Sequence, residues 1–177
     1  MMDEALHQIC AVLKTTAPRW SNLAETLPRE LLDRPPAPGE WSAAQCLQHL
    51  LDAERAVFPV RLRALLAGQE RLAAFDPETQ GSATAGQSPA DVAAEFARLR
   101  AESLALLARV TPADLVRAAE HGELGRVTLG ELLHEWAAHD LMHTVQAERA
   151  LMQPFIPGSG PWRPYFQNHD VAAPARA

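Results

Sequence analysis

Apolar residues recur at helical spacing along the first part of the chain. Over residues 3–27 they fall every three or four positions, which places them on one face of a helix. The segment RPPAPGE, residues 34–40, ends this pattern because proline is excluded from the interior of a helix. The pattern therefore predicts a first helix over residues 3–27, whose buried stripe comprises Leu6, Ile9, Leu13, Trp20, Leu23 and Leu27.

A capping motif at residues 42–45 predicts the start of a second helix. Ser42 is followed three residues later by Gln45, and together they form a capping box in which each side chain bonds the other residue's backbone N–H. The apolar pattern that follows predicts a helix over residues 42–68, with Gly68 as its C-cap. Pro59 lies inside this segment, so we expect a kink there.

Two further start signals appear in the second half of the chain. The motif SPAD at residues 88–91 places a serine cap before a proline, and predicts a helix that ends near Val110. A similar motif, TPAD at residues 111–114, predicts a short helical turn. The capping box TLGE at residues 128–131 predicts a last long helix that runs to about Met152.

Four long amphipathic helices indicate an all-α fold, a four-helix bundle. The connection over residues 69–87 is long and polar, and its length permits a crossover between helices. We interpret the chain as a single domain over residues 1–177, with its core over about 3–152. The tail, residues 153–177, is rich in proline and aromatic residues, and we expect it to pack as irregular chain over the bundle.

Composition narrows the class of protein. The chain is 47% apolar and poor in β-branched residues, which argues against a large sheet. Its net charge is -6 and its arginines are interleaved with acidic residues, so we expect no nucleic-acid partner. Cys10 and Cys46 lie in helical apolar patterns and are predicted to be buried thiols in a reducing compartment. With no signal pattern and no apolar run of about 18 residues, we expect a soluble cytoplasmic protein and no membrane partner.

Three of the seven histidines lie in the segment GELLHEWAAHDLMHTVQAERAL, residues 130–151. Each helical residue turns by about 100°, so the direction of each side chain follows from its spacing. On this estimate His139 and His143 lie within or beside the apolar stripe, whereas His134 lies on the opposite side. On the second predicted helix, His49 lies at the edge of the apolar stripe. Three histidines from two helices are thus predicted to face the bundle interior.

This pattern fits a metal site. Histidines at positions i and i+4, as His139 and His143 are, can reach one ion from one helix face. His49 would complete a three-histidine face that leaves coordination positions open, which is typical of catalytic rather than closed structural sites. The alternative is that the histidines are core residues hydrogen-bonded to carbonyl groups or to each other.

The neighbours of these histidines are open to several interpretations. Cys46 lies one turn before His49 and is either a fourth ligand or, more commonly for a helix, a small buried residue. Asp140 is better explained as a residue that supports a ligand or pairs helices than as a ligand, and Gln146 could line the cavity. We interpret Asp52 and Glu54 as solvated charges, although Glu54 could support a neighbouring side chain. The remaining histidines are interpreted as surface or loop residues: His7, His121 and His169.

Two short motifs carry a resemblance to a known family. The segment GEWSAAQCLQHLLDAE, residues 39–54, and the segment HDLMHTVQ, residues 139–146, resemble the two signatures of the DinB-like (damage-inducible, YfiT-type) superfamily. The segment VTLGELL, residues 127–133, is similar to the usual approach to the second signature. The resemblance covers about residues 3–152.

The resemblance implies a four-helix bundle with a crossover, often assembled as a homodimer. It also implies a divalent metal ion (Ni, Zn, Fe or Mn) held by His49, His139 and His143. Some relatives transfer groups to low-molecular-weight thiols such as mycothiol or bacillithiol, and others are labelled metal-dependent hydrolases. We therefore expect a metal-dependent enzyme of thiol S-transferase or hydrolase type that acts on a small molecule. The alternative is a non-catalytic, stress-associated protein that binds a metal or a ligand.

Overall fold

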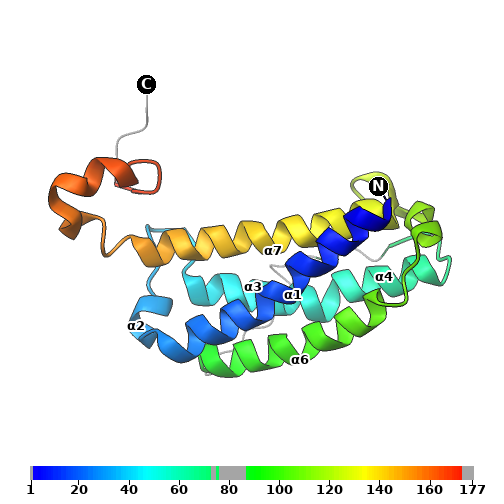
Figure 1. Ribbon diagram of the computed structural model, residues 1–177, viewed down its shortest axis with the longest axis horizontal. Coiled ribbons are helices and arrows are strands. Elements are labelled where there is room, and N and C mark those ends of the chain that lie inside the picture. The colour runs from blue at the N-terminus through cyan, green and yellow to red at the C-terminus, as the bar shows by residue number, and fades with distance from the viewer. Residues whose placement is uncertain (1, 73–74, 76–86, 173–177) are drawn as a thin grey trace.

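A computed structural model describes residues 2–72, 75 and 87–172 of the chain. The predicted helices are present, as Figure 1 shows. The first is α1 (Met2–Thr26), and a short α2 (Arg29–Leu32) follows it. The third long helix is α6 (Pro89–Leu107) and the last is α7 (Leu129–Met152). None of the helices in the described part of the chain is long and apolar enough to cross a membrane.

The second predicted helix is divided into α3 (Ala43–Ala56) and α4 (Phe58–Leu66). The break falls at Val57, whose φ of -113° and ψ of -80° leave the helical region. Pro59 lies in the first turn of α4, where its missing N–H costs no helical hydrogen bond. The kink that we expected at Pro59 is therefore real, but the backbone departs from the helix two residues earlier.

The capping boxes form as predicted. Ser42 Oγ accepts the backbone N–H of Gln45 at 3.2 Å, and the Gln45 side chain accepts the N–H of Ser42 at 2.8 Å. Thr128 and Glu131 exchange the same pair of bonds at the start of α7. These caps satisfy backbone donors that would otherwise be unpaired, and so they fix where the two histidine-bearing helices begin.

The helices pack as a bundle in which α1 and α3 each contact both α6 and α7. Helices that follow one another in the chain, α1 and α3 or α6 and α7, therefore lie diagonally across the bundle. The connections that cross it are residues 27–42 and 108–128. The crossover is confirmed, but it is not made by residues 69–87, whose length permitted one; they join the neighbouring units α3–α4 and α6.

A small hairpin was missing from the sequence-based prediction. The turn expected at residues 111–114 is the 3₁₀ helix η1 (Pro112–Val116), and it leads into β1 (Ala118–His121) and β2 (Gly125–Thr128). These strands pair antiparallel, and Gly125 adopts the positive φ of 72° that the tight turn requires. The hairpin packs at the end of the bundle, directly before α7.

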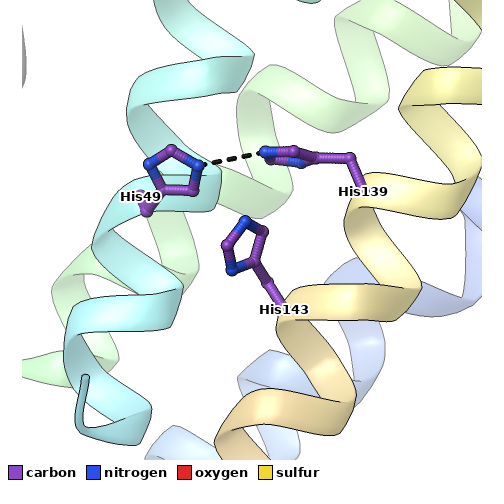
Figure 2. Close-up of side chains that lie close together, drawn as sticks. All are labelled: His49, His139 and His143. Carbon is purple, nitrogen blue, oxygen red and sulfur yellow. Dashed lines mark hydrogen bonds between the residues drawn. The ribbon is translucent and has the colours of Figure 1, made fainter. Parts of the chain in front are cut away.

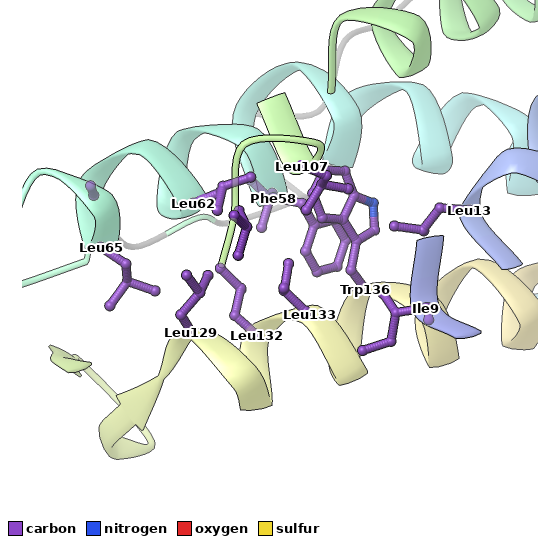
Figure 3. Close-up of a cluster of buried hydrophobic side chains, with 14 of the residues drawn as sticks. Ile9, Leu13, Phe58, Leu62, Leu65, Leu107, Leu129, Leu132, Leu133 and Trp136 are labelled. Carbon is purple, nitrogen blue, oxygen red and sulfur yellow. The ribbon is translucent and has the colours of Figure 1, made fainter. Parts of the chain in front are cut away.

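Two apolar clusters make the core. One surrounds Trp136 and Phe58 and is drawn in Figure 3. The other surrounds Trp20 and Phe96. The guanidinium of Arg100 lies against an aromatic ring from each cluster, 4.8 Å from the centre of Phe96 and 5.5 Å from that of Trp136. A charged group is thus buried where the two apolar clusters approach each other.

The C-terminal tail differs from the prediction. It forms a 3₁₀ segment, η2 (Pro157–Phe166), interrupted at Gly160, and extends beyond the end of α7 instead of packing over the bundle (Figure 1). Its contacts with the end of α7 include hydrogen bonds of Arg149 and Gln153 to the carbonyl of His169. Three of its large apolar side chains are exposed to solvent: Phe155, Trp162 and Tyr165.

Candidate metal centre

Three histidines meet where α3 faces α7. Figure 2 shows His49 on α3 and His139 and His143, one turn apart, on α7, with their rings directed toward one another. One nitrogen from each ring lies within 4.8 Å of the other two. The Nε2 atoms of His49 and His139 are 3.0 Å apart. The structure thus brings together the three histidines that the sequence singled out. His134, which is also on α7, is exposed.

Neighbouring side chains fix the orientation of each ring. His143 Nδ1 lies 2.8 Å from Gln146 Oε1, so its N–H donates there and the Nε2 lone pair is left available. Trp41 stacks on His143 at 5.6 Å between ring centres, with an interplanar angle of 20°. Phe58 packs edge-on against His139 at 5.1 Å. Gln146 therefore orients the ring of His143, whereas the sequence suggested only that it could line a cavity.

Burial keeps these imidazoles neutral. Burial, together with weaker repulsion from the neighbouring histidine rings, lowers the pKa of His49 from 6.5 to about 4 and that of His139 from 6.5 to about 3. The pKa of His143 is also lowered, mainly by burial. An imidazole binds a metal only in its neutral form. All three rings are therefore in the protonation state that a metal requires at neutral pH.

The separation of the His49 and His139 nitrogens fits a shared small cation. Nitrogens bound to one ion at about 2.0–2.1 Å are about 2.8–3.4 Å apart for angles between square and tetrahedral. The 3.0 Å separation of the two Nε2 atoms lies within that range. The Nδ1 atom of His139 is buried and has no hydrogen-bond partner among the residues that the structure describes. When a histidine binds a metal through one ring nitrogen, the other nitrogen faces away from the metal and usually carries the proton. Nδ1 of His139 is in that second position, because Nε2 faces the cluster.

A cavity of about 230 Å³ opens beside the cluster, and both His49 and His139 line it. The cavity is also lined by His121, from the end of β1, and by Arg61 and Glu135. His121 was interpreted from sequence as a surface or loop residue; it is half-buried at the end of β1, and its place at the cavity was not foreseen. The hairpin brings it to the cavity, and no local sequence pattern signals this.

Cys46 does not take part in the histidine cluster. Its side chain is fully buried, and burial raises the pKa of the thiol from 9.0 to about 12. The group of nitrogens that could share an ion comprises the three histidines. Of the two interpretations of Cys46, a small buried residue and a fourth ligand, the structure supports the first.

The acidic residues near the histidines are more buried than we predicted. Asp52 accepts a hydrogen bond from Gln48 and lies 3.6 Å from Arg55. Glu54 is fully enclosed and accepts two bonds from Arg100. The interpretation of Asp52 and Glu54 as solvated charges is therefore wrong, and only the suggestion that Glu54 supports a neighbouring side chain agrees with the structure.

Asp140 pairs helices, as one of our interpretations proposed. Its carboxylate accepts two hydrogen bonds from Arg100 of α6, at 2.6 and 3.2 Å. Arg100 was missed in the sequence. A signal for it exists, because it lies at helical spacing between the buried residues Phe96, Ser103 and Leu107.

Comparison with known proteins agrees with this architecture. YfiT from Bacillus subtilis, described as a probable metal-dependent hydrolase with an unusual four-helix bundle topology, superposes with a TM-score of 0.70. The two chains are 20% identical, and the superposition covers 82% of this chain and 85% of that one. At this level of identity the likeness establishes the fold. No curated protein sequence matches the chain.

The sequence itself matches a family. The match to the DinB superfamily spans residues 13–147, which run from α1 into α7 and include all three clustered histidines. The bundle, in which consecutive helices lie diagonally, agrees with this match. The chain belongs to the DinB superfamily.

Proposed function

We propose that the chain binds one divalent metal ion through His49, His139 and His143 and acts as a metal-dependent enzyme on a small molecule. The observation that carries the proposal is the meeting of three neutral imidazoles from two helices, with one nitrogen of each within 4.8 Å of the others. Such a set leaves coordination positions open on the ion for water or substrate. The description of YfiT as a probable metal-dependent hydrolase supports the same class of activity.

When bound, the ion would lower the pKa of a coordinated water or thiol. Residues that line the cavity would surround the substrate and hydrogen-bond to it. Phe58 and Val57 contribute apolar wall that excludes water from the approach to His139. His121 Nδ1 accepts the backbone N–H of Glu123 at 3.3 Å, so a neutral His121 carries its proton on Nε2. That N–H is available to hydrogen-bond a substrate held between the metal centre and the hairpin.

The cavity supports a small substrate, because about 230 Å³ is too little for a macromolecule. Two reactions fit the centre. In a hydrolase the activated group is water, and in an S-transferase it is a low-molecular-weight thiol that attacks an electrophile. Three imidazoles suit Ni, Zn and Fe, and Mn less well, so the donor set leaves the identity of the metal open.

Two further features support a cytoplasmic homodimer. Leu141, Met142 and Val145 form an exposed apolar patch on the outer face of α7, of the kind that a second copy covers. Cys10 and Cys46 are both free thiols, which fits a reducing compartment. Light scattering on the purified protein, with a Val145→Asp variant, tests the dimer, because a charge in the interface should yield monomers.

The proposed activity is tested with metal-loaded, untagged protein against esters and amides, and against thiols paired with model electrophiles. We expect turnover that is lost in His49→Ala, which removes one ligand. The control is His134→Ala, an exposed histidine of α7, the helix that also carries His139 and His143, and it should retain full activity. Turnover that survives in His49→Ala contradicts the proposal, and stoichiometric metal without turnover assigns the protein to non-catalytic metal binding.

A further inference from the structure

The guanidinium of Arg100, on α6, is a charge buried in the interior of the bundle. It donates to Glu54 Oε2 from Nε and Nη2, at 3.1 and 2.8 Å. It also donates to both carboxylate oxygens of Asp140 and, at 3.0 Å, to the carbonyl of Leu13. The side chains of Arg100, Glu54 and Asp140 are 2%, 0% and 1% exposed. Water therefore does not compete for these bonds.

The partners of Arg100 lie on the helices that hold the histidines. Glu54 is on α3, five residues after His49, and Asp140 is on α7, next to His139. One planar side chain thus joins the two helices that hold the cluster, although its own helix α6 contributes no histidine to it. Asp140 is fixed further, because its backbone carbonyl accepts the hydroxyl of Thr144 at 2.8 Å.

Stability alone does not explain a charged group in this position. A buried ion pair usually contributes no more to stability than apolar side chains of similar volume, because removing charges from water offsets their attraction. The neighbours of Arg100 include Phe96 and Trp136, so an apolar side chain would also be accommodated. Apolar side chains, however, make no directional bonds. The hydrogen bonds of an arginine are directional and can fix one separation between two helices.

A metal centre depends on such a separation. Its ligands must be held close to their binding geometry by the residues that support them. We propose that Arg100, with Glu54 and Asp140, is a clamp that sets the distance between α3 and α7 at the histidine cluster and thereby sets metal affinity. This inference rests on the proposed metal site and assigns these three residues a positioning role, with no contact to the metal or to substrate.

The decisive variant replaces the clamp as a whole with Arg100→Met, Glu54→Leu and Asp140→Leu in one chain, so that no buried charge is left unpaired. Two quantities are measured. One is the urea unfolding of the metal-free protein, and the other is Co²⁺ affinity by competition with a chelator, with the Co²⁺ absorption spectrum as a record of ligand geometry. We expect unfolding close to wild type, Co²⁺ affinity weaker by about 10- to 100-fold, and an altered spectrum.

The matched control is a second ion pair that also joins α3 and α6. Arg55 of α3 and Glu95 of α6 lie 2.6 Å apart near the surface, with side chains 29% and 31% exposed. Changing both residues to glutamine should leave Co²⁺ affinity and spectrum unchanged. A general loosening of the bundle would weaken Co²⁺ binding in both variants, whereas the clamp predicts a loss only where Arg100 is involved.

A conservative variant keeps the test decisive if the triple variant does not fold. Arg100→Lys retains the charge but loses the planar fork that binds two carboxylates at once, so Co²⁺ affinity should again fall. Wild-type affinity in a folded triple variant, or in Arg100→Lys, overturns the clamp. If the wild-type protein itself binds no Co²⁺, the proposed metal site fails instead, so the two failures are distinguishable.

Discussion

Phe58 connects the apolar core to the metal centre, and its replacement tests both. Its ring is 3% exposed and stacks on Trp136 at 5.1 Å with an interplanar angle of 6°. It also makes an edge-to-face contact with His139, at 5.1 Å between ring centres. A change at Phe58 should therefore alter the stability of the bundle and the environment of one histidine together.

The size of the effect follows from these contacts. Removing a buried phenylalanine side chain as Phe58→Ala costs about 3–5 kcal/mol through lost transfer energy and the cavity left behind. A stacked aromatic pair contributes about 0.5–1.5 kcal/mol beyond its burial, which places Phe58→Ala in the upper part of that range. Phe58→Leu keeps most of the apolar volume, so it should cost about 1–3 kcal/mol. Against a typical total of about 5–15 kcal/mol, the first is severe and the second is tolerable.

Urea unfolding of the metal-free variants, followed by circular dichroism, measures these costs. The control is Phe155→Ala, because Phe155 is 64% exposed on the tail and its loss should change the free energy of unfolding by no more than about 0.5 kcal/mol. If Phe58→Ala and Phe155→Ala prove equally mild, the packing described for the centre is wrong.

Three further predictions follow from the burial and capping of particular residues. The pKa of His139 is lowered to about 3 and that of His49 to about 4, so below pH 6.5 the unfolded chain binds protons that the folded, metal-free protein does not. Its free energy of unfolding should be fully retained above pH 6.5 and decrease as the pH falls toward 4, and a flat profile in urea titrations over this window would refute it. Cys46, whose thiol pKa is raised to about 12, should resist iodoacetamide in the folded protein and react after unfolding, as mass spectrometry will show; rapid native alkylation would count against its burial. Thr128→Ala removes the cap of α7 and should lower the free energy of unfolding by about 1 kcal/mol in urea titrations, whereas an unchanged value would mean that the capping bonds contribute nothing.

The features that the sequence predicted correctly are local or periodic. A capping box occupies four consecutive residues, so Ser42 and Thr128 mark helix starts without any knowledge of the tertiary fold. The inward direction of His139 and His143 follows from the fixed turn per residue of a helix. His49 required only the further step that apolar stripes face one another in a bundle.

The features that the sequence did not reveal depend on contacts between distant segments. Glu54 was judged to be solvated because its burial depends on Arg100, a residue of another helix, 46 positions away. His121 reaches the cavity only because a short hairpin, with little apolar pattern of its own, packs at the end of the bundle. The connections that cross the bundle could not be identified from sequence, because loop length alone does not determine which helices become neighbours.

The central claim is that His49, His139 and His143 share one metal ion. The most direct test is a crystal structure of metal-loaded protein with anomalous diffraction recorded at the absorption edge of the metal. We expect one anomalous peak between α3 and α7, at about 2.0–2.1 Å from a nitrogen of each of the three rings. A peak elsewhere, or no peak at this position in protein shown to contain metal, would contradict it.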